Sequence, residues 1–565
     1  MSLTKVSYSM IAGAVANVLD YGATGDGTTD DTAAIQLAID SGKRVYFPAG
    51  TYILTIGTSI TLEGGSTFCS LVAVSGMQLT GDGWNKSILK LKDNQSTNAN
   101  PKYFNIIAGN TVMDDILIEG LQFDINGANN KINSNNGYNC CAFICSGSVA
   151  TVGVDARLHN AKFLNNLIQN SPGNSCIGLG QSNTAGYTLG QNIEIAGNIF
   201  YNNGLDTNDH SSIYAFAESV NIHDNLFYHP TMSTGTNGPR VACELHGARN
   251  NFHDNEVYNY FGGVYISGNG TSIAYNQSIT NNDFLTGNFA VAAFIESATE
   301  PGCKYVTVSG NRIWITGDYD NSNKVGIGIH PSNGKVDNVN VTGNVIYSSD
   351  TNVMPGILVY SLATNTINNI LIDGNNIQGV TVGVSVGYAG GLAADNVAVT
   401  NNIINATTTT GTPIYAFGVN VGGVVGTVNI SNNTITGTII AGVWVDSACT
   451  ATKISIANNV VTGTTSYGVV LTTNTDIANL NMHDNDAYTA TISPIVDQLT
   501  VSGHRHGKQA CTFAALPAQS TWDNGDIAYN SGVTNAAGDV TAWFRITSGS
   551  NNVLDTDWRG FGVTV

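Results

Sequence analysis

A short phrase with the pattern apolar-x-apolar-x-x-Asn-x-apolar recurs along the chain and constrains its fold more than any other feature. It occurs as IEIAGNIF, VNIHDNLF, VTVSGNRI, VNVTGNVI, ILIDGNNI, VAVTNNII, VNISNNTI, ISIANNVV and LNMHDNDA. The asparagines of these phrases are Asn198, Asn225, Asn311, Asn344, Asn375, Asn402, Asn433, Asn459 and Asn485, and degenerate copies add Asn255 and Asn276. Period-2 strands that return every 21 to 35 residues predict a β-solenoid, in which each repeat forms one coil.

A second short strand is predicted between consecutive asparagine phrases, as in GGVYISG, VGIGIHP, PGILVYS, AGVWVDS and YGVVLTT. Each coil therefore contains two or three strands that meet at sharp bends. Asparagine suits such bends because it tolerates left-handed backbone angles, and stacked copies can form a ladder of amide hydrogen bonds. We interpret the asparagines as scaffold and not as a binding motif.

The repeat divides the chain into segments. Weaker phrases at 116–123 and 156–163 extend the coils upstream, and the pattern stops near His504. We expect an N-terminal linker or attachment segment at 1–15, a solenoid entry at 16–110, the main solenoid at 111–503 and a small C-terminal β domain at 504–565.

The entry segment carries the only helix that we predict. Its sequence TAAIQLAID is amphipathic and follows three candidate N-cap residues, Thr29, Asp30 and Asp31. Such a helix would cover the open edge of the first coil, which otherwise exposes unpaired backbone and an apolar end.

Composition excludes several classes of function. Only 11% of the residues are charged and the net charge is -19, so nucleic acid is not an expected partner. No segment approaches 18 consecutive apolar residues, and the N-terminus lacks a signal-peptide pattern, so we expect neither membrane insertion nor the usual secretion route. Nine cysteines without a CxxC pair indicate no disulfide framework, and we expect no metal site and no cofactor. Cys140 and Cys141 are interpreted as buried apolar residues.

Two stretches near the N-terminus carry a resemblance to a known family. VLDYGATGDGTTDDTAAIQLAIDSGKRVYFPAGTYIL (18–54) and MQLTGDGWNKSIL (77–89) resemble the opening of the pectate-lyase-like superfamily, and within it the bacteriophage tailspike proteins that degrade surface polysaccharide. The resemblance implies an all-β, right-handed parallel β-helix that binds a bacterial capsule, exopolysaccharide or O-antigen. It also implies a homotrimer in the virion tail, attached to a tail or baseplate protein through its N-terminus and acting extracellularly on the host surface.

The C-terminal segment resembles small terminal modules of tailspikes and related phage proteins. In that family such modules help to trimerise the spike or touch glycan. Trp522, Trp543 and Trp558 could serve either role here.

The stretch RVACELHGAR at 240–249 places an arginine, a glutamate and a histidine on one strand of a weakly charged protein. Alternation predicts that Val241, Cys243 and Leu245 fill the solenoid, whereas Arg240, Glu244 and His246 point outward. Packing does not explain three long polar side chains on one strand face. Glu244 is therefore the strongest candidate for a catalytic carboxylate.

Cleavage of a glycosidic bond needs a second carboxylate near the first. Alignment of neighbouring coils, which stack about 4.8 Å apart, would place Glu218 roughly 5 to 7 Å from Glu244, and Glu296 roughly 9 to 10 Å away. The bend at 202–212 adds Asp206 and Asp209. The resemblance to hydrolytic tailspikes favours Asp209, because an Asp/Glu pair on neighbouring coils is their usual arrangement.

Outward residues of the same and adjacent coils form the predicted substrate-binding set. Aromatic rings there would stack on sugars. The set is Arg240, His246, Tyr214, Tyr265, Phe294, His330, Tyr360 and Arg249.

Three functions remain open from the residues alone. The first is an endo-acting glycoside hydrolase that uses Glu244 with one of the carboxylates above. The second is a polysaccharide lyase, in which Arg240, His246 or Arg249 abstracts a proton and Tyr265 or Tyr258 acts as the acid. The third is a spike that grips glycan without cleaving it.

Overall fold

The structure is a computed structural model that describes residues 15 to 563 apart from short gaps. The gaps fall at 63–64, 133–139, 147–157, 181–188, 208, 235–237, 269–273, 296–302, 317–323, 330–334, 349–354, 361–365, 388–393, 408–416, 438, 448, 464–465, 473–475, 487–492, 498–509, 514–526, 531–539 and 548–552.

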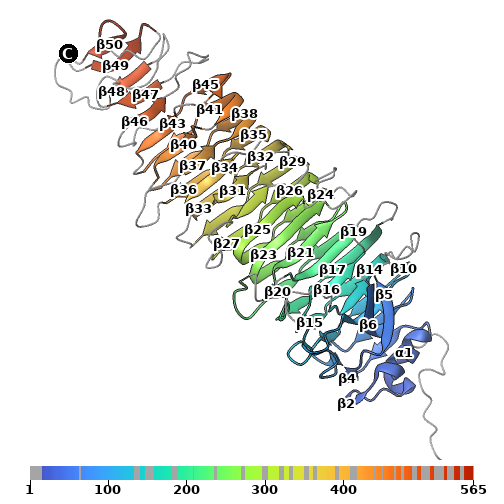
Figure 1. The fold of residues 1–565 in the computed structure, drawn as a ribbon. Helices are drawn as coiled ribbons and strands as arrows, with labels where there is room; N and C mark the ends of the chain where they lie inside the picture. The colour runs from blue at the N-terminus through green and yellow to red at the C-terminus, as the bar shows by residue number, and fades with distance from the viewer. Residues whose placement is uncertain are drawn as a thin grey trace, which may run out of the picture. The chain divides into compact units, whose positions relative to one another are not determined.

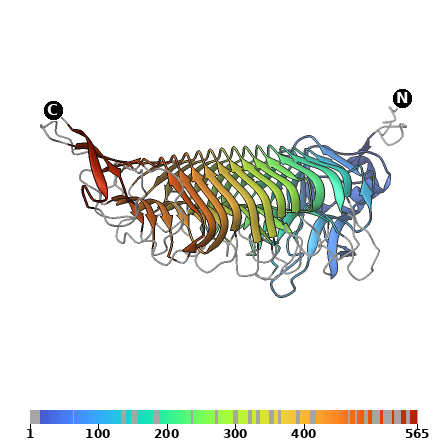
Figure 2. The same cartoon turned by 90° about the horizontal axis from the view of Figure 1, so that it is seen from above.

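A parallel β-solenoid of about twelve turns accounts for most of the described chain, which confirms the fold predicted from the repeat. Each coil contributes one strand to each of three faces, which we call face 1, face 2 and face 3 (Figures 1 and 2). The chain divides into two compact units within β25 (Asp283–Ile295). The first unit contains the described residues up to Val291 and the second contains those from Lys304 onward.

The first unit contains the N-terminal coils. On face 1 lie β1 (Ala16–Asn17), β3 (Val45–Phe47), β7 (Gln78–Gly81), β10 (Met113–Asp114), β11 (Leu117–Glu119), β14 (Leu158–Leu164), β17 (Gly190–Ala196), the end of β19 (Ser211–His223), β22 (Asn251–His253) and β24 (Ala274–Thr280). On face 2 lie β2 (Asp26–Asp30), β4 (Gly50–Leu54), β8 (Ser87–Leu91), β12 (Gln122–Asp124), β15 (Leu167–Gln169), β18 (Ile199–Tyr201), β20 (Leu226–Tyr228) and the start of β23 (Glu256–Gly268). On face 3 lie β5 (Thr58–Leu62), β6 (Gly65–Val72), β9 (Phe104–Gly109), β13 (Phe143–Cys145), β16 (Ser175–Leu179), the start of β19, β21 (Val241–His246) and the end of β23.

The second unit repeats the same three faces. On face 1 lie β26 (Cys303–Ser309), β29 (Lys335–Thr342), β32 (Thr366–Asp373), β35 (Ala394–Thr400), β38 (Val424–Ser431), β41 (Thr450–Ala457), β44 (Asp476–Ile477) and β45 (Leu480–His483). On face 2 lie β27 (Arg312–Ile315), β30 (Val345–Ser348), β33 (Asn376–Val380), β36 (Ile403–Ala406), β39 (Thr434–Thr436) and β42 (Val460–Val461). On face 3 lie β28 (Ile327–Ile329), β31 (Pro355–Val359), β34 (Val382–Val386), β37 (Phe417–Val421), β40 (Ala441–Val445), β43 (Tyr467–Leu471) and β46 (Ser493–Asp497).

Alternation of apolar and polar residues builds the core, because every second side chain of a strand points inward. On face 2 of the second unit, Ile313, Ile346, Ile377, Ile404 and Ile435 occupy equivalent inward positions on successive strands. Each of them is at most 3% exposed. β-branched side chains stacked in this way fit the pleated surface well and are stiff, so they favour strands over helices.

A ladder of buried asparagines joins face 1 to face 2 in each coil and confirms the scaffold role predicted for them. Asn198 donates from its backbone N–H to Oδ1 of Asn225 at 2.9 Å, and from its own Nδ2 to the same oxygen at 3.0 Å. Asn225 repeats both contacts with Asn255. In the first unit the ladder runs through Asn166, Asn198, Asn225, Asn255 and Asn282. In the second unit it runs through Asn311, Asn344, Asn375, Asn402, Asn433, Asn459 and Asn485.

Two details of the asparagine prediction are wrong. The left-handed residue is the one before the ladder asparagine, such as Gly197 or Asp224, and the ladder asparagine itself is held by its hydrogen bonds. The ladder residue of its coil is Asn282, whereas Asn276 is exposed on face 1 with a φ of 53°. Asn276 shares this left-handed position with Asn160 and Asn192 of earlier coils.

The N-terminal helix α1 (Thr32–Asp40) matches the predicted segment. Ile35, Ala38 and Ile39 form its buried side, and it packs against β1, β6 and the 3-10 turn η2 (Val18–Tyr21). The Asp30 carboxylate accepts the Thr32 N–H at 3.1 Å. The Asp31 carboxylate instead accepts the backbone N–H groups of Thr24 and Gly25, which fixes the preceding turn.

A small separate sheet near the C-terminus contains β47 (Ala510–Phe513), β48 (Ile527–Asn530), β49 (Val540–Arg545) and β50 (Trp558–Val563). One of its pairings is parallel and two are antiparallel. Trp543 and Trp558 are 6% and 0% exposed, so they form the core of this sheet and offer no ring face to a sugar. Trp522 lies outside the described residues.

All eight cysteines that the structure describes are free and buried, including Cys140 and Cys141. Burial raises the pKa of their thiols, to about 11 for Cys69 and to about 12 for Cys145. Buried thiols that resist ionisation are poor nucleophiles and poor metal ligands. The cysteines therefore act as small apolar residues of the core.

Candidate glycan-processing site on the third face

Three outward side chains meet in one row on face 3 of the first unit. Strand register places Glu244 of β21 between Tyr214 of β19 and Tyr265 of β23. Val241, Cys243 and Leu245 are fully buried, which confirms the inward half of the predicted alternation. The row therefore presents a carboxylate with an aromatic residue on each neighbouring coil.

The Glu244 carboxylate is held by two donors and is 18% exposed. Ser211 Oγ donates to Oε2 at 3.0 Å, and His246 Nε2 lies 3.1 Å from Oε1. Burial by itself raises the pKa of this carboxyl, but the hydrogen bonds from His246 and Ser211 and the charge of Arg240 bring the pKa below its ordinary value. Glu244 is therefore ionised and fixed in one orientation.

Asp209 lies in the bend before β19 and approaches Glu244 across Arg240. Its Oδ1 is 3.6 Å from Arg240 Nη1, and its side chain is 64% exposed. Partial burial and the negative charge of Glu244 raise the pKa of Asp209, and the Arg240 charge opposes them without reversing the shift. The environments of the two carboxyls thus move their pKa values in opposite directions, which is the pattern of a general acid beside a base.

Arg240 also contacts the aromatic row, because its guanidinium lies 5.7 Å from the centre of the Tyr265 ring. Tyr265 in turn packs against Phe289, with ring centres 4.7 Å apart. This placement gives Arg240 contacts with Asp209 and Tyr265 at once. The binding role of Arg240 stays a prediction.

A buried chain of hydrogen bonds, which sequence reasoning missed, fixes the bend that carries Asp209. His210 is fully buried, and its Nδ1 donates to the Gly173 carbonyl. Its Nε2 lies 3.0 Å from Ser212 Oγ, which lies 2.8 Å from the Tyr260 hydroxyl. Only the position of His210 next to Asp209 could have drawn attention to it. The chain ties three coils together directly behind the candidate acid.

Acid is expected to destabilise the protein through His210. Burial lowers the pKa of His210 from 6.5 to about 4, so the unfolded chain binds this proton first as the pH falls. Stability is therefore lost between about pH 6.5 and about pH 4, by at most about 3 kcal/mol. Guanidinium unfolding at pH 7 and pH 4.5 measures the loss. His210→Gln should lose less stability than the wild type over this range, and His483→Gln, a control at a partly exposed histidine, should lose as much as the wild type. Equal losses in all three proteins would contradict the assignment.

Two predicted residues lie at the corner between face 3 and face 1, away from the row. Register pairs Glu218 with Gln191 of β17, and the Glu218 carboxylate binds Arg249 at 2.5 Å. Arg249 also donates to the Tyr275 hydroxyl at 2.9 Å. The prediction that Glu218 lies beside Glu244 in one row is wrong, because Tyr214 occupies that place and the chain turns at Ser219, where φ is 55°.

Of two further candidates, Asp206 holds a loop in place and His246 is buried beneath other side chains. Asp206 accepts the Ile132 N–H at 2.9 Å and anchors a loop. His246, which we predicted to project into a groove, is 1% exposed. It lies under Phe216 with ring centres 4.7 Å apart and contacts Tyr214 at 5.1 Å. His246 can therefore reach a substrate only through Glu244.

The remaining predicted residues lie outside the described part of the chain or in the second unit. Glu296 and His330 lie outside the described residues, as does the side chain of Phe294. Tyr360 follows β31 in the second unit, partly exposed, with its N–H on the Ile329 carbonyl.

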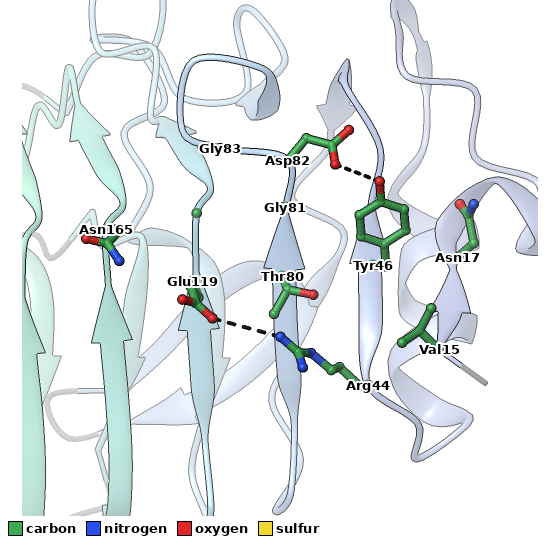
Figure 3. Close-up of a pocket in the computed structure, with 11 residues that line it drawn as sticks. Val15, Asn17, Arg44, Tyr46, Thr80, Gly81, Asp82, Gly83, Glu119 and Asn165 are labelled. Atoms are coloured by element: carbon green, nitrogen blue, oxygen red, sulfur yellow. Dashed lines mark hydrogen bonds and ion pairs between the residues drawn. The ribbon is translucent and has the colours of Figure 1, made fainter. Parts of the chain in front are cut away.

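Two hollows of the surface lie on face 1, and neither contains Glu244. The larger, about 700 Å³, is lined by β3, β7 and β11 (Figure 3). In it the Tyr46 hydroxyl donates to Asp82 at 2.6 Å, and Arg44 lies 3.9 Å from Glu119. The second is lined by Lys162, Glu194 and neighbouring residues of the same face. Face 3 differs from both hollows, because there Glu244 and Asp209 lie around one arginine, Arg240.

Comparison with known proteins bears on the fold. A family model described as rhamnogalacturonase A/epimerase, pectate lyase-like, matches residues 15–282. The model covers just under half of this chain, and the fold is a right-handed parallel β-helix. The β-helix resembles the solved tailspike protein of E. coli bacteriophage HK620 in complex with a pentasaccharide, at 17% identity and a TM-score of 0.56 over 81% of each chain. It also resembles the N-terminal fragment of bacteriophage Phi29 gene product 12, at 17% identity and a TM-score of 0.54 over 88% of this chain and 89% of that one.

Curated relatives match only a short part of the β-helix. Mannuronan C5-epimerase AlgE2 of Azotobacter vinelandii is 44% identical over 82 residues, which are 14% of this chain and 8% of that protein. Alginate lyase 7 of the same organism is 40% identical over 82 residues, 14% of this chain and 9% of that protein. The match thus spans less than a tenth of either relative.

Two kinds of feature are absent from the described residues. No helix among them is long and apolar enough to cross a membrane. No group of three or more His, Cys, Asp or Glu side chains in the described ranges is arranged to hold a metal ion.

Proposed function

We propose that this β-helix is a tailspike-type protein that binds a bacterial surface polysaccharide and cleaves it by endo-glycosidic hydrolysis. Glu244 and Asp209 form the carboxylate pair. The ionised Glu244 is the base or nucleophile, and Asp209 donates a proton to the leaving oxygen. Tyr214 and Tyr265 flank Glu244 on adjacent coils and offer rings to the sugars.

One observation carries this proposal: two carboxyls with opposite pKa shifts lie around a single arginine. Glu244 is ionised by its donors, whereas Asp209 is shifted toward the protonated form. Solved structures of the HK620 tailspike include variants in which a glutamate is substituted, alone or with an aspartate 33 residues before it. Asp209 precedes Glu244 by a similar distance, 35 residues.

β-Elimination is a second candidate, because the matched family and the curated relatives include epimerases and an alginate lyase. Arg240 and Tyr265 would then act as base and acid. Burial alone lowers the pKa of Arg240, but Tyr265, Asp209 and Glu244 raise it overall. A guanidinium held in its charged form is a poor base. The charge state of Arg240 therefore favours hydrolysis.

The products of cleavage decide between the candidates. The chain is incubated with purified capsular and O-antigen polysaccharides and with alginate, and reducing ends and the ultraviolet absorbance of new C=C bonds are measured. Hydrolysis gives reducing ends without absorbance, and elimination gives both. Binding with neither product would support a spike that only grips glycan and would overturn the enzymatic proposal.

The biological setting belongs to the same proposal. By analogy with tailspikes, the protein forms a homotrimer in the virion tail, attaches to a tail or baseplate protein through its N-terminus and acts on the host cell surface. The support is the likeness of the β-helix to the HK620 tailspike.

A further inference from the structure

The larger hollow on face 1, which we call the entry hollow, lies across three successive strands of the first unit, β3, β7 and β11 (Figure 3). Its volume of about 700 Å³ is within the range of roughly 300–1,000 Å³ that is usual for ligand sites. Strand register places Tyr46, Thr80 and Glu119 side by side across these strands. Thr80 is 8% exposed and forms the floor between the two larger side chains.

Tyr46 gives the entry hollow an aromatic ring that is held in one orientation. Its hydroxyl donates to Asp82 Oδ1 at 2.6 Å, and Asp82 Oδ2 accepts the Ala49 N–H at 3.0 Å. Figure 3 shows the ring face-on, with its hydroxyl turned toward Asp82. The hydrogen bond to Asp82 raises the pKa of Tyr46, so the ring stays uncharged at neutral pH. A fixed, uncharged aromatic face suits stacking against a sugar ring.

Arg44 and Glu119 face each other in the entry hollow without a direct hydrogen bond. Arg44 Nη2 lies 3.9 Å from Glu119 Oε2, and the two side chains are 48% and 40% exposed. A direct charge-assisted hydrogen bond would be about 2.7–2.9 Å long, as it is between Lys162 and Glu194 on the same face, at 2.7 Å. An oxygen about 2.8 Å from both atoms fits the wider gap. A hydroxyl group there would donate to the carboxylate and accept from the guanidinium at once.

The charges and strands around the entry hollow exclude other classes of ligand. Two carboxylates, Asp82 and Glu119, outnumber Arg44, the one cation among the described lining residues, so an anion such as phosphate or a uronate is disfavoured. No group of three or more His, Cys, Asp or Glu side chains in the described ranges could hold a metal ion. Each lining strand pairs on both sides with a neighbouring strand, so none offers an edge to an extended peptide. A neutral ligand rich in hydroxyl groups fits this lining.

We propose that the entry hollow binds a neutral hexose unit of a glycan, at a site separate from the row on face 3. The sugar ring stacks on Tyr46, and one of its hydroxyl groups bridges Arg44 and Glu119. Asp82 already accepts two hydrogen bonds, and Glu119 faces a guanidinium. The hollow therefore holds the sugar and does not cleave it.

The entry hollow and the row on face 3 are far enough apart to bind sugars independently. On face 1, five successive strand pairings lead from β3, which carries Tyr46, to the end of β19, which belongs to the coil of Glu244. At about 4.8 Å per pairing, Tyr46 and Glu244 are roughly 24 Å apart along the axis. One hexose cannot reach both sites, whereas a polysaccharide can. A second grip on the same polymer would raise its affinity by avidity, a consequence that, unlike the site itself, rests on the proposed function.

Binding of simple sugars tests the proposal without any polysaccharide. The full chain is titrated with the methyl glycosides of glucose, galactose, mannose, rhamnose and N-acetylglucosamine, and binding is followed by saturation-transfer NMR. At least one should bind, with a Kd of roughly 1 mM for a ligand of this size. Tyr46→Ala and Arg44→Ala should each weaken this binding about 10-fold. Tyr46→Phe keeps the ring and should bind about as well as the wild type.

Two control variants locate the binding. Face 3 is itself proposed to bind sugars, so the entry hollow is identified by the binding that Tyr46→Ala removes and Tyr265→Ala, on face 3, leaves in place. Lys162→Ala removes a cation of face 1 whose ion pair is closed, and it should also leave this binding in place. All variants should keep the β circular dichroism spectrum of the wild type.

Three results would overturn the proposal. They are no binding by any of the five glycosides, full binding by Tyr46→Ala or Arg44→Ala, and displacement of the sugar by inorganic phosphate, which would indicate an anion site. Cleavage is a separate measurement, because Tyr46→Ala should cleave short oligosaccharides at the wild-type rate. A wild type that binds hexose but cleaves nothing would contradict the proposed hydrolysis and leave the entry hollow supported.

Discussion

Replacing Glu244 by glutamine is expected to lower the rate of polysaccharide cleavage by about 10³-fold, while the folded assembly remains. Glutamine keeps the size of the side chain and can still accept from Ser211, which now donates to Oε2 at 3.0 Å. It cannot act as a base or nucleophile. Reducing-end assays on the best polysaccharide substrate measure the loss, and pull-down on the same polymer should show that binding is retained.

Glu218→Gln is the matched control for this experiment. It makes the same change on the adjacent coil, but Glu218 is bound to Arg249 at the corner. We expect wild-type cleavage from it. A Glu244→Gln protein that cleaves at the wild-type rate would remove the carboxylate pair from the proposal, and a strong loss in Glu218→Gln would move the catalytic site to the corner.

Replacing Asn225 by alanine is expected to destabilise the protein by about 3 kcal/mol or more. Asn225 is 2% exposed, and its Oδ1 accepts the Asn198 N–H while its Nδ2 donates to the Ile195 carbonyl at 2.8 Å. Alanine removes the partners of these two buried groups, at about 1–3 kcal/mol each, whereas the Asn198 side-chain amide keeps the Phe163 and Ala196 carbonyls. Guanidinium unfolding followed by circular dichroism should show a lower midpoint.

Asn340→Ala separates this effect from the general cost of losing an asparagine in a strand. Asn340 is exposed on β29 and lies outside the ladder. The free energy of unfolding of this variant should differ from that of the wild type by no more than about 0.5 kcal/mol, as is usual for surface substitutions. Equal losses from the two variants would mean that the ladder contributes nothing special.

The fold was predictable because its signal repeats. Each coil restates the alternation of inward aliphatics and a buried asparagine, so an error in one copy leaves the others intact. Asn276 is such an error. Asn276 occupies a left-handed, exposed position, whereas the buried ladder residue Asn282 directly follows a second left-handed asparagine, Asn281.

The candidate site was less predictable because it appears once and depends on neighbouring coils. Alternation within one strand placed Glu244 outward, but it also placed His246 outward, where His246 is buried against Phe216 of the preceding coil. Strict alternation along β19 placed Glu218 in the row, because no residue type in this strand indicates that the chain turns at Ser219. Contacts between coils decide such details, and a single sequence does not contain them.

Because the ladder asparagines bond only to residues of their own and the adjacent coils, a coil can be added or removed without altering bonds farther along the ladder. Asp209 and Glu244 come from adjacent repeats, so insertions in other repeats leave their spacing unchanged. The reach of the protein can therefore evolve in whole steps of about 4.8 Å, independently of the chemistry that it carries.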